Sequence, residues 1–269
     1  MFKNQKPSTP SLRHTVIALK VLAKKPLLKS LIRLNSKSLG KCKHSGRIIT
    51  RYKEVGAKKK YRMIDFKEGK ELKVGVVCSL EHDPYRSANI MSVFSRTEKF
   101  FIYLLATSGI NVGDVVACGK SAPIKNGNTT LISRLPLGAF ICNVPFPGQV
   151  KGKLARSAGS YCVLKSSTEK FCLVESPSRA MKQVQSDASV TVGRVSNDLH
   201  FLERTGKAGR SRWKGRRPAN RGVSMNPVDH PNGGGEGKKS GPGKTPWGGR
   251  IKGLKTSCSR QLSSTASKH

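Results

Sequence analysis

The segment Val74-Gly-Val-Val-Cys-Ser-Leu80 sets the pattern of the middle of this chain, because apolar side chains recur there at every second position. Alternation of this kind is typical of a β-strand with one face buried, and it would place Val74, Val76, Cys78 and Leu80 on the same face. The segment therefore predicts a sheet packed on a core.

Several later segments have the same short, apolar character. They span residues 100–105, 115–118, 138–144, 161–165, 171–175 and 189–195. The first of these is continuously apolar, as in a strand buried on both faces. Turn residues such as Asn126-Gly127 and Pro147-Gly148 separate the segments. Short strands at this spacing predict small antiparallel barrels and not βαβ units. Two barrels joined near residues 121–127 fit the spacing better than one.

Charge is distributed unevenly along the 269 residues, whose formal net charge is +36. Residues 1–62 hold 18 basic residues and one acidic residue, residues 63–205 hold 18 and 12, and residues 206–269 hold 15 and two. Two basic arms therefore flank a nearly neutral middle. So much positive charge disfavours a compact monomer unless a polyanion neutralises it. Prolines and glycines interrupt the apolar stretch 135–150, so a membrane-spanning segment is not expected.

The second arm is rich in Gly and Pro between residues 206 and 253 and lacks apolar periodicity. Such a segment buries too little surface to offset its ordering entropy, so we expect it to become ordered against a partner. Residues 206–221 interleave glycines, the stacking face of Trp213 and seven cations. Arginine binds phosphate through two parallel hydrogen bonds, and aromatic rings stack on bases. This stretch is the strongest indication of nucleic-acid binding.

The first arm leaves two interpretations open. Residues 12–34 are apolar and basic without acids, which is typical of a mitochondrial presequence as well as of an RNA-contacting extension. Basic clusters follow at residues 47–51 and 58–62, where Tyr61 could stack on a base or belong to a barrel core. Residues 83–89 are predicted to form a turn that carries Arg86 outward, and residues 151–159 a basic loop between strands.

Other chemistry is poorly supported. A phosphate-binding loop ending at Gly243-Lys-Thr245 would need glycine where Lys238 stands, and a dinucleotide motif fails at Ser240. Asp229-His230 lacks a rigid scaffold for catalysis, so His230 is expected to contact RNA or to be merely exposed. Cys42 and His44 lack a second ligand pair for zinc, and the seven unpatterned cysteines suggest free thiols.

Nothing resembles a recognition helix for the DNA major groove, whereas long basic extensions suit folded RNA. Two rivals are an RNA-acting enzyme using His230, which would need a rigid protein pocket around it, and a DNA-compacting protein, which would bind long duplexes.

The sequence closely resembles the universal large-subunit ribosomal protein family "L two", of bacterial type. The resemblance rests on N-P-V-D-H-P-N-G-G-G-E-G at 226–237 and on ordered matches along the chain. The matches lie at 8–14, 35–38, 46–51, 61–66, 83–90, 154–159, 206–213, 221–230 and 245–248. By resemblance, the chain is a non-enzymatic structural component that binds large-subunit rRNA, neighbouring ribosomal proteins and the small subunit.

The resemblance implies a mainly β fold in four parts: a basic extension (1–45), an OB-like barrel (46–122), an SH3-like barrel (123–205) and a basic Gly-rich extension (206–269). With the basic clusters, it gives these expected rRNA contacts: Arg47, Arg51, Lys58, Lys59, Lys60, Arg62, Arg86, Lys153, Arg156, Lys207, Arg210, Arg212, Trp213, Lys214, Arg216, Arg217, Arg221, Lys238, Lys239, Lys244, Trp247 and Arg250. It also implies that these residues lie near the peptidyl-transferase region: Asn226, Asp229, His230, Asn232 and Gly233.

The chain departs from the family pattern in places. Asn232 stands where the family usually has a second histidine, and Val55-Gly-Ala-Lys-Lys59 replaces its usual G-G-G-H-K. Because the resemblance begins by Ser8, no long cleavable leader is expected. These departures and the cysteine content favour the mitochondrial matrix, with plastid stroma or bacterial cytoplasm as alternatives. No catalytic residue, metal site or cofactor is expected beyond Mg²⁺ as a counterion of the rRNA.

Overall fold

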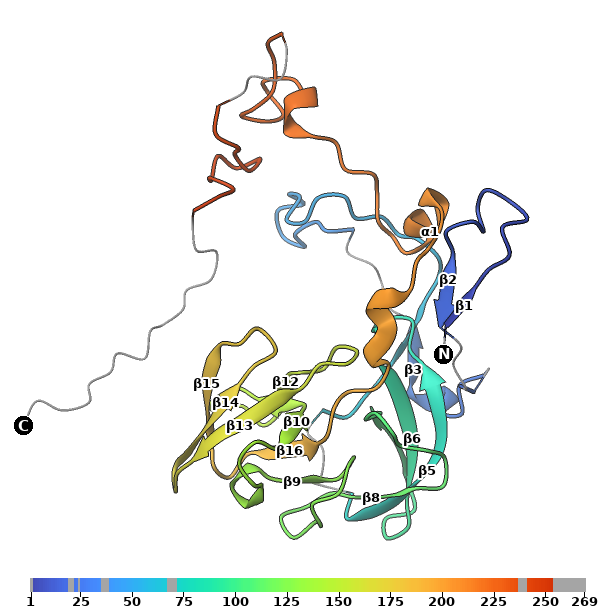
Figure 1. Cartoon of the computed structure of the whole chain (residues 1–269), viewed down its shortest axis with the longest axis vertical. Coiled ribbons are helices and arrows are strands. Elements are labelled where there is room, and N and C mark those ends of the chain that lie inside the picture. Colours follow the sequence, from blue (N-terminus) through green and yellow to red (C-terminus); the bar gives the residue numbers. More distant parts are fainter. Residues whose placement is uncertain are drawn as a thin grey trace, which may run out of the picture.

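The protein, seen in a computed structural model, is mainly β, as the sequence predicts, with two curled sheets side by side and arms that extend away from them (Figure 1). The structure describes residues 2–18, 22–23, 25–34, 39–66, 72–236 and 241–253. Among them, no helix is long and apolar enough to cross a membrane.

The first sheet is antiparallel and has the strand order β7-β6-β5-β8. Its strands are β5 (Val74–His82), β6 (Asn89–Ser95), β7 (Phe101–Leu105) and β8 (Val115–Ala117). The core on one face contains buried side chains from every strand, among them Val77, Met91, Leu104 and Val116.

The predicted strand at β5 is confirmed, but the predicted face is wrong. Val74 is 40% exposed and Val77 is 1% exposed, so at the start of the strand the core lies on the face of Val77 and not on the face of Val74. A bulge between Val77 and Ser79 then shifts the register. An extra residue on one strand reverses the alternation, so Leu80 packs on the same core as Val77. A regular period-two pattern cannot show this reversal.

The other face of the first sheet is covered by the first arm. Leu28 packs there with Ile90 and Tyr103. Buried Glu81 accepts hydrogen bonds from the Leu27 backbone N–H and from the Tyr103 hydroxyl, both at 2.9 Å. The Leu28 N–H donates to the same hydroxyl at 3.1 Å. The Glu81 carboxylate therefore holds the first arm against the barrel at Leu27 and Leu28.

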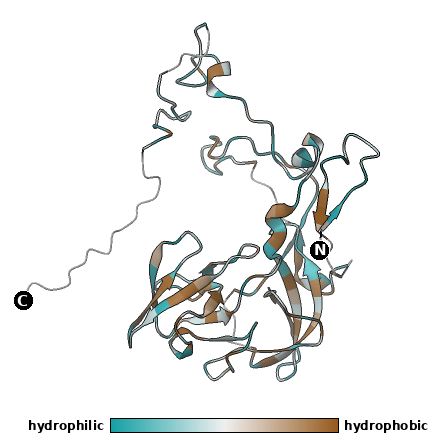
Figure 2. Cartoon of the chain, in the orientation of Figure 1, coloured by the Kyte–Doolittle hydropathy of each residue, from teal (hydrophilic) through white to brown (hydrophobic). Residues whose placement is uncertain are grey.

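The second sheet has the order β15-β14-β13-β10-β16-β9. Its strands are β9 (Thr129–Leu131), β10 (Phe140–Cys142), β13 (Cys162–Ser167), β14 (Phe171–Glu175), β15 (Met181–Gln185) and β16 (Ser189–Val192). Its core includes three fully buried cysteines, Cys142, Cys162 and Cys172. Figure 2 shows hydrophobic residues gathered along these strands and hydrophilic ones along the arms.

Some elements differ from the sequence-based expectations. The single strand expected at 138–144 is divided, because Asn143 has φ +52° and separates β10 from β11 (Val144–Pro145). The basic loop expected at 151–159 contains the strand β12 (Gly152–Leu154). Within the segment 100–105, which was expected to be buried on both faces, Phe101 is 42% exposed.

The two barrels share part of one core. Ala88 and Leu105 come from the first barrel but pack in the core of the second. Thr107 forms a β-bridge with Val195. Asn197 donates a side-chain hydrogen bond to the Ser87 carbonyl oxygen at 2.6 Å. These contacts fix the two barrels against each other.

The remaining elements are short. They are β1 (Phe2–Asn4), β2 (Val16–Ala18), β3 (Ile32–Leu34), β4 (Lys60–Arg62), helix α1 (Ala208–Trp213), and 3₁₀ helices at Lys29–Leu31, Ile132–Arg134, Asp198–Leu202 and Gly222–Ser224. The β1-β2 hairpin is tied to the start of the second arm by a bridge between Val16 and Arg204.

Candidate nucleic-acid interface

A groove lies where β4, the turn after β5 and the segment that follows β12 meet. Its volume is about 770 Å³. It is lined by aromatic and cationic side chains from both barrels, which are Tyr61, Phe66, Tyr85, Arg86, Lys153 and Arg156. The basic stretches that the sequence singled out at 83–89 and 151–159 therefore contribute cations to one site, whereas the stretch 58–62 contributes Tyr61 and none of its cations.

Two arginines share one aromatic ring in this groove. The guanidinium carbons of Arg86 and Arg156 lie 5.4 Å and 4.4 Å from the centroid of the Phe66 ring. Arg86 is fixed by buried Asp83, whose carboxylate accepts its Nε–H at 2.6 Å. Burial, and then the charge of Arg86, lower the pKa of Arg156. Two cations this close repel each other, so a bound anion would stabilise the pair.

Tyrosines form another wall of the groove. Tyr61 and Tyr85 meet edge to face, with ring centroids 5.5 Å apart. Tyr61 is half-buried at the groove and belongs to neither barrel core, so the alternative of a core residue is wrong, and stacking on a base stays a prediction. The Tyr85 hydroxyl is buried without a hydrogen-bond partner among the described residues. A buried hydroxyl of this kind is suited to a ligand that offers an acceptor.

The cluster at residues 58–62 divides between solvent and barrel. Lys58 and Lys60 are exposed, whereas Arg62 is only 9% exposed and donates from Nη1 to the Lys60 carbonyl oxygen. Arg62 therefore offers little surface to a ligand, although the sequence groups it with its neighbours.

The cationic stretch of the second arm begins in α1. Lys207 lies over the ring of Trp213, with Nζ 4.9 Å from the centroid, and Trp213 is 57% exposed. Arg210 points inward and donates to the Thr15 hydroxyl at 3.0 Å. Lys214, Arg216, Arg217 and Arg221 are exposed. The stretch thus presents cations and one stacking face together.

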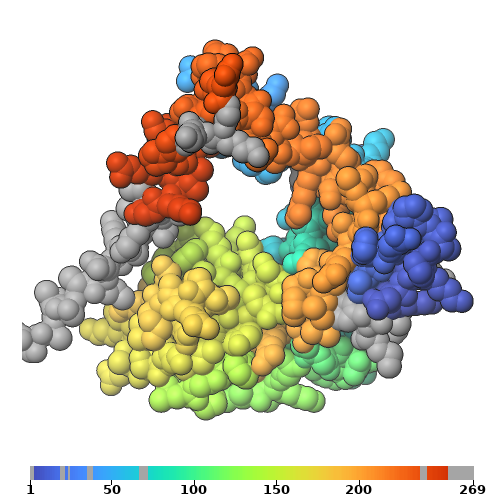
Figure 3. All heavy atoms as spheres, turned by 45° about the horizontal axis from the view of Figure 1, so that its top comes forward, coloured from blue at the N-terminus to red at the C-terminus, as the bar shows by residue number. Residues whose placement is uncertain are grey.

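The two basic arms pair with each other although they are far apart in sequence. Arg212 forms an ion pair with Glu54 at 2.8 Å. Lys53 forms a β-bridge with Arg216, and the Ala57 N–H donates to the Trp213 carbonyl oxygen at 2.9 Å. Figure 3 shows the second arm (orange to red) arching away from the barrels, with open space beneath it.

Glycines permit this close approach of the arms. Gly56 has φ +61°, and a Cβ there would lie 2.5 Å from the Trp213 carbonyl oxygen. Gly215 has φ +83°, and a Cβ there would lie 2.6 Å from the Glu54 carbonyl oxygen. Only glycine fits at such contacts without displacement of the backbone.

His230 lies inside a compact turn of the second arm and is 8% exposed. Its Nδ1 accepts the Asn232 backbone N–H at 3.0 Å, and its ring packs on Gly222, where a Cβ would lie 2.3 Å from the ring. The alternative of a merely exposed histidine is therefore wrong. The ring also offers little surface for stacking on RNA, because the arm itself covers it.

Asn232, which replaces the usual histidine, has a definite partner. Its Oδ1 accepts the Lys244 backbone N–H at 3.0 Å. Lys244 in turn forms a bridge with Arg250, and Trp247 between them is 69% exposed. Of the other expected residues near this turn, Asn226 and Asp229 are exposed and Gly233 is half-buried. Two expected contacts, Lys238 and Lys239, lie outside the described residues.

The described residues include no group of three or more His, Cys, Asp or Glu side chains placed to hold a metal ion. None of the six described cysteines forms a disulfide with another described residue.

Comparison with known proteins agrees with this geometry. A family model described as "Ribosomal Proteins L2, RNA binding N-terminal domain" matches residues 28–118, and one described as "Ribosomal Proteins L2, C-terminal domain" matches residues 125–248. The chain belongs to the ribosomal protein L2 family. The resemblance noted from the sequence motifs is thus confirmed.

Bacterial relatives match nearly the whole chain. The "Large ribosomal subunit protein uL2" of Buchnera aphidicola (subsp. Acyrthosiphon pisum, strain Tuc7) is 42% identical over 253 residues, which cover 93% of this chain and 92% of that protein. The protein of the same name from Parabacteroides distasonis is 42% identical over 263 residues, covering 96% and 94%. That from Wolbachia pipientis (subsp. Culex pipiens) is 43% identical over 253 residues, covering 93% and 92%.

Membership of the L2 family supports the non-enzymatic character expected from the sequence, because this is a family of structural ribosomal proteins. The N-terminal L2 model covers the first sheet, and the C-terminal L2 model covers the second sheet and the second arm as far as Gly248. The groove lies where the two matched regions meet.

Sequence reasoning missed Phe66 and Tyr85 as site residues. Tyr85 is adjacent to Arg86, and Phe66 lies four residues after Arg62, but an aromatic residue beside a strand is usually part of a core. The pairing of Glu54 with a cation could have been predicted from the sequence. It is the one acidic residue in the first 62 residues of the sequence, and a lone acid in a basic arm suggests a specific cationic partner.

Proposed function

We propose that this chain is a structural constituent of the large ribosomal subunit that binds and stabilises large-subunit rRNA during translation. The observation that carries the proposal is the groove in which Arg86 and Arg156 flank Phe66. Its cations, half-buried aromatic rings and unpartnered hydroxyl suit a phosphate with a neighbouring base. The relatives are named as large-subunit proteins, which supports the same assignment.

The charge distribution indicates different roles for the barrels and the arms. The barrels orient the protein through the groove, and the arms enter RNA crevices where phosphates screen their charge. Association is driven by the release of counterions from each neutralised phosphate. Neighbouring ribosomal proteins are the expected protein partners, and Mg²⁺ enters only as a counterion of the RNA.

Further parts of the proposal concern position and compartment. The family resemblance supports placing the turn around His230 near the peptidyl-transferase region and giving the protein a role in association with the small subunit. The departures from the family pattern and the cysteine content support the mitochondrial matrix, with plastid stroma and bacterial cytoplasm as alternatives. Sedimentation of the tagged chain with ribosomes from purified organelles would distinguish these compartments.

The RNA proposal is tested by the double variant Arg86→Ala/Arg156→Ala. We expect at least a tenfold weaker affinity for large-subunit rRNA, since a hydrogen bond to a charged group contributes about 1.5–3 kcal/mol. The log–log salt slope should fall in magnitude by about 0.7, because one phosphate is no longer neutralised. Filter binding between 50 and 300 mM salt measures both quantities.

The matched control is Lys170→Ala/Lys182→Ala, which removes the same charge from exposed positions of the second barrel. It should leave affinity and slope close to those of the unchanged protein. Equal effects of the two double variants would mean that net charge, and not the groove, governs binding, and the proposal would be wrong.

A further inference from the structure

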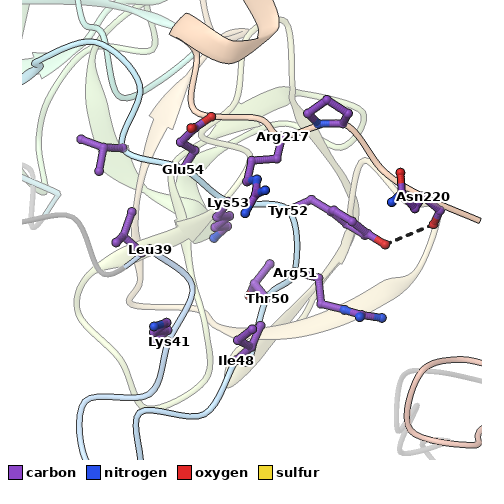
Figure 4. A pocket seen from close by; sticks show the side chains of 12 residues that line it. Leu39, Lys41, Ile48, Thr50, Arg51, Tyr52, Lys53, Glu54, Arg217 and Asn220 are labelled. Carbon is purple, nitrogen blue, oxygen red and sulfur yellow. Dashed lines mark hydrogen bonds between the residues drawn. The ribbon is translucent and has the colours of Figure 1, made fainter. Parts of the chain in front are cut away.

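A second cavity, of about 510 Å³, lies between the two basic arms and away from the groove (Figure 4). One wall is the first-arm segment 39–55, and the other is the second-arm segment 217–220. This volume lies within the range of pockets that hold small ligands. The arms have no core of their own here, so the cavity arises from the way they pair.

The lining combines positive charge with apolar surface. Lys41, Arg51, Lys53 and Arg217 supply four cations. The acidic lining residue, Glu54, is already paired with Arg212 of the second arm. The net character of the cavity is therefore cationic, which favours an anionic ligand.

Apolar residues of the lining remain open to solvent. Leu39 is 43% exposed and Ile48 is 55% exposed, and both line the cavity. A ligand that fits both features has an anionic group joined to a flat apolar body. A nucleotide has this chemistry, whereas a bare phosphate would leave the apolar surface uncovered.

Tyr52 is held in a defined orientation at the centre of the cavity. Its backbone has φ +58°, which is costly for a residue other than glycine. Its hydroxyl donates to the Asn220 carbonyl oxygen at 3.1 Å, and its own carbonyl oxygen accepts the Arg217 N–H at 3.0 Å. Figure 4 shows the ring directed across the cavity toward Asn220. An aromatic ring fixed at both ends loses little entropy when a base stacks on it.

Arg51 provides a second indication of a missing ligand. Its guanidinium carbon lies 5.7 Å from the centroid of the Tyr52 ring, and its Nη1 is buried without a partner among the described residues. A buried guanidinium nitrogen is costly to leave unsatisfied. A phosphate beside a base stacked on Tyr52 would supply the acceptor.

We propose that this cavity holds one unstacked nucleotide of single-stranded RNA, with its base against Tyr52 and its phosphate contacted by Arg51 and Arg217. The proposal rests on the proposed function, because it specifies one nucleotide-sized contact within the RNA-bound protein. Proteins recognise unpaired RNA by splaying single bases onto aromatic side chains, which agrees with this arrangement.

Two measurements on intact large subunits carrying the full-length chain test the proposal. In the first, irradiation at 254 nm followed by digestion and mass spectrometry should find a mononucleotide adduct on the peptide that contains Tyr52. In the second, 2′-hydroxyl acylation of the rRNA compares subunits with Tyr52→Ala, Tyr52→Phe, Arg51→Met and the control Lys43→Met. Lys43 is an exposed cation of the same arm that does not line the cavity.

Tyr52→Ala should raise the reactivity of one or two adjacent nucleotides by about 5- to 150-fold, the range that corresponds to the loss of one base stack. Tyr52→Phe keeps the ring and should retain most of the protection, Arg51→Met should give a partial increase at the same nucleotides, and Lys43→Met should give none. The adduct on the unchanged protein does not depend on any variant folding correctly.

The proposal is overturned if the subunit-bound protein gives no adduct at Tyr52, or if Tyr52→Ala changes no nucleotide by more than about twofold. A crosslink from Tyr52 to another protein would also overturn it. These results leave the proposed function intact, because the protein still sediments with the subunit. Failure of the unchanged chain to sediment with large-subunit rRNA would instead refute the proposed function itself.

Discussion

Replacing Glu81 with alanine should destabilise the first barrel more than any surface change. The carboxylate is 1% exposed and accepts three hydrogen bonds at 2.9 Å, from the Leu27 N–H, the Ser79 hydroxyl and the Tyr103 hydroxyl. Removing it leaves a backbone donor and a phenol hydroxyl without their acceptor inside the barrel. At the same time the first arm loses the hydrogen bond that holds Leu27 against the barrel.

The size of the effect follows from these partners. An orphaned buried donor costs about 1–3 kcal/mol, and Glu81→Ala orphans the fully buried Tyr103 hydroxyl together with the N–H of Leu27, a half-exposed residue whose share lies at the lower end of that range. The Ser79 hydroxyl keeps a partner, because it also lies 2.7 Å from the Ser92 hydroxyl. The free energy of unfolding should therefore fall by about 3–5 kcal/mol, in line with other broken buried polar networks. Glu81→Gln keeps the shape and one acceptor, so it should cost about 1–2 kcal/mol.

Urea unfolding followed by far-ultraviolet circular dichroism measures this change. Tryptophan fluorescence would not, because Trp213 and Trp247 both lie in the second arm, outside the barrels. The control Glu169→Ala removes an exposed carboxylate and should shift stability by less than about 0.5 kcal/mol. If Glu81→Ala were as stable as that control, the carboxylate would not anchor the arm and the reasoning from burial would fail.

Burial raises the pKa of Tyr103 to about 12, above the value of about 10 in an unfolded chain. The buried neutral hydroxyl of Tyr103 should therefore stabilise the fold fully below pH 10, and this stabilisation should be lost between about pH 10 and 12. The free energy of unfolding, measured across this range, should fall in the unchanged protein but not in Tyr103→Phe. A hydrogen bond from the Ser45 backbone is the main cause that lowers the pKa of the Cys42 thiol, whereas burial raises the pKa of Cys162 to about 12. Iodoacetamide at pH 7.5 should therefore alkylate Cys42 before Cys162. Equal alkylation rates at the two cysteines in peptide mass mapping would contradict this. Gly215→Ala should destabilise the pairing of the two arms by at least about 1–2 kcal/mol and should therefore speed hydrogen exchange of the first-arm amides that face it. The control Gly209→Ala places its Cβ in open space and should leave these exchange rates unchanged.

Fold class was accessible from the sequence because short apolar strands and turn residues carry local information. The strands that the sequence missed show where that information ends. β6 is buried on nearly every residue and so shows no alternation, and β15 is a polar edge strand in which Val184 alone is buried. The bulge in β5 reverses a pattern that looks regular in the sequence.

The candidate site was predictable in its parts but not in its assembly. The cations Arg86 and Arg156 could be named from turns and basic loops, because charge is visible in one dimension. Their meeting over Phe66 depends on how the two barrels dock, which involves residues far apart in the chain. The pairing of Glu54 with Arg212 spans 158 residues and has no local pattern at all.

Leu105 packs in the core of the second barrel together with Val195, which follows it by 90 residues. At synthesis rates of about 5–20 residues per second, Leu105 emerges roughly 5–18 s before Val195 completes this core. During that interval the nascent first barrel carries an uncovered apolar edge. Chaperones that bind unfolded chains, or slow translation between the two halves, would thus matter for the yield of this protein more than for its final stability.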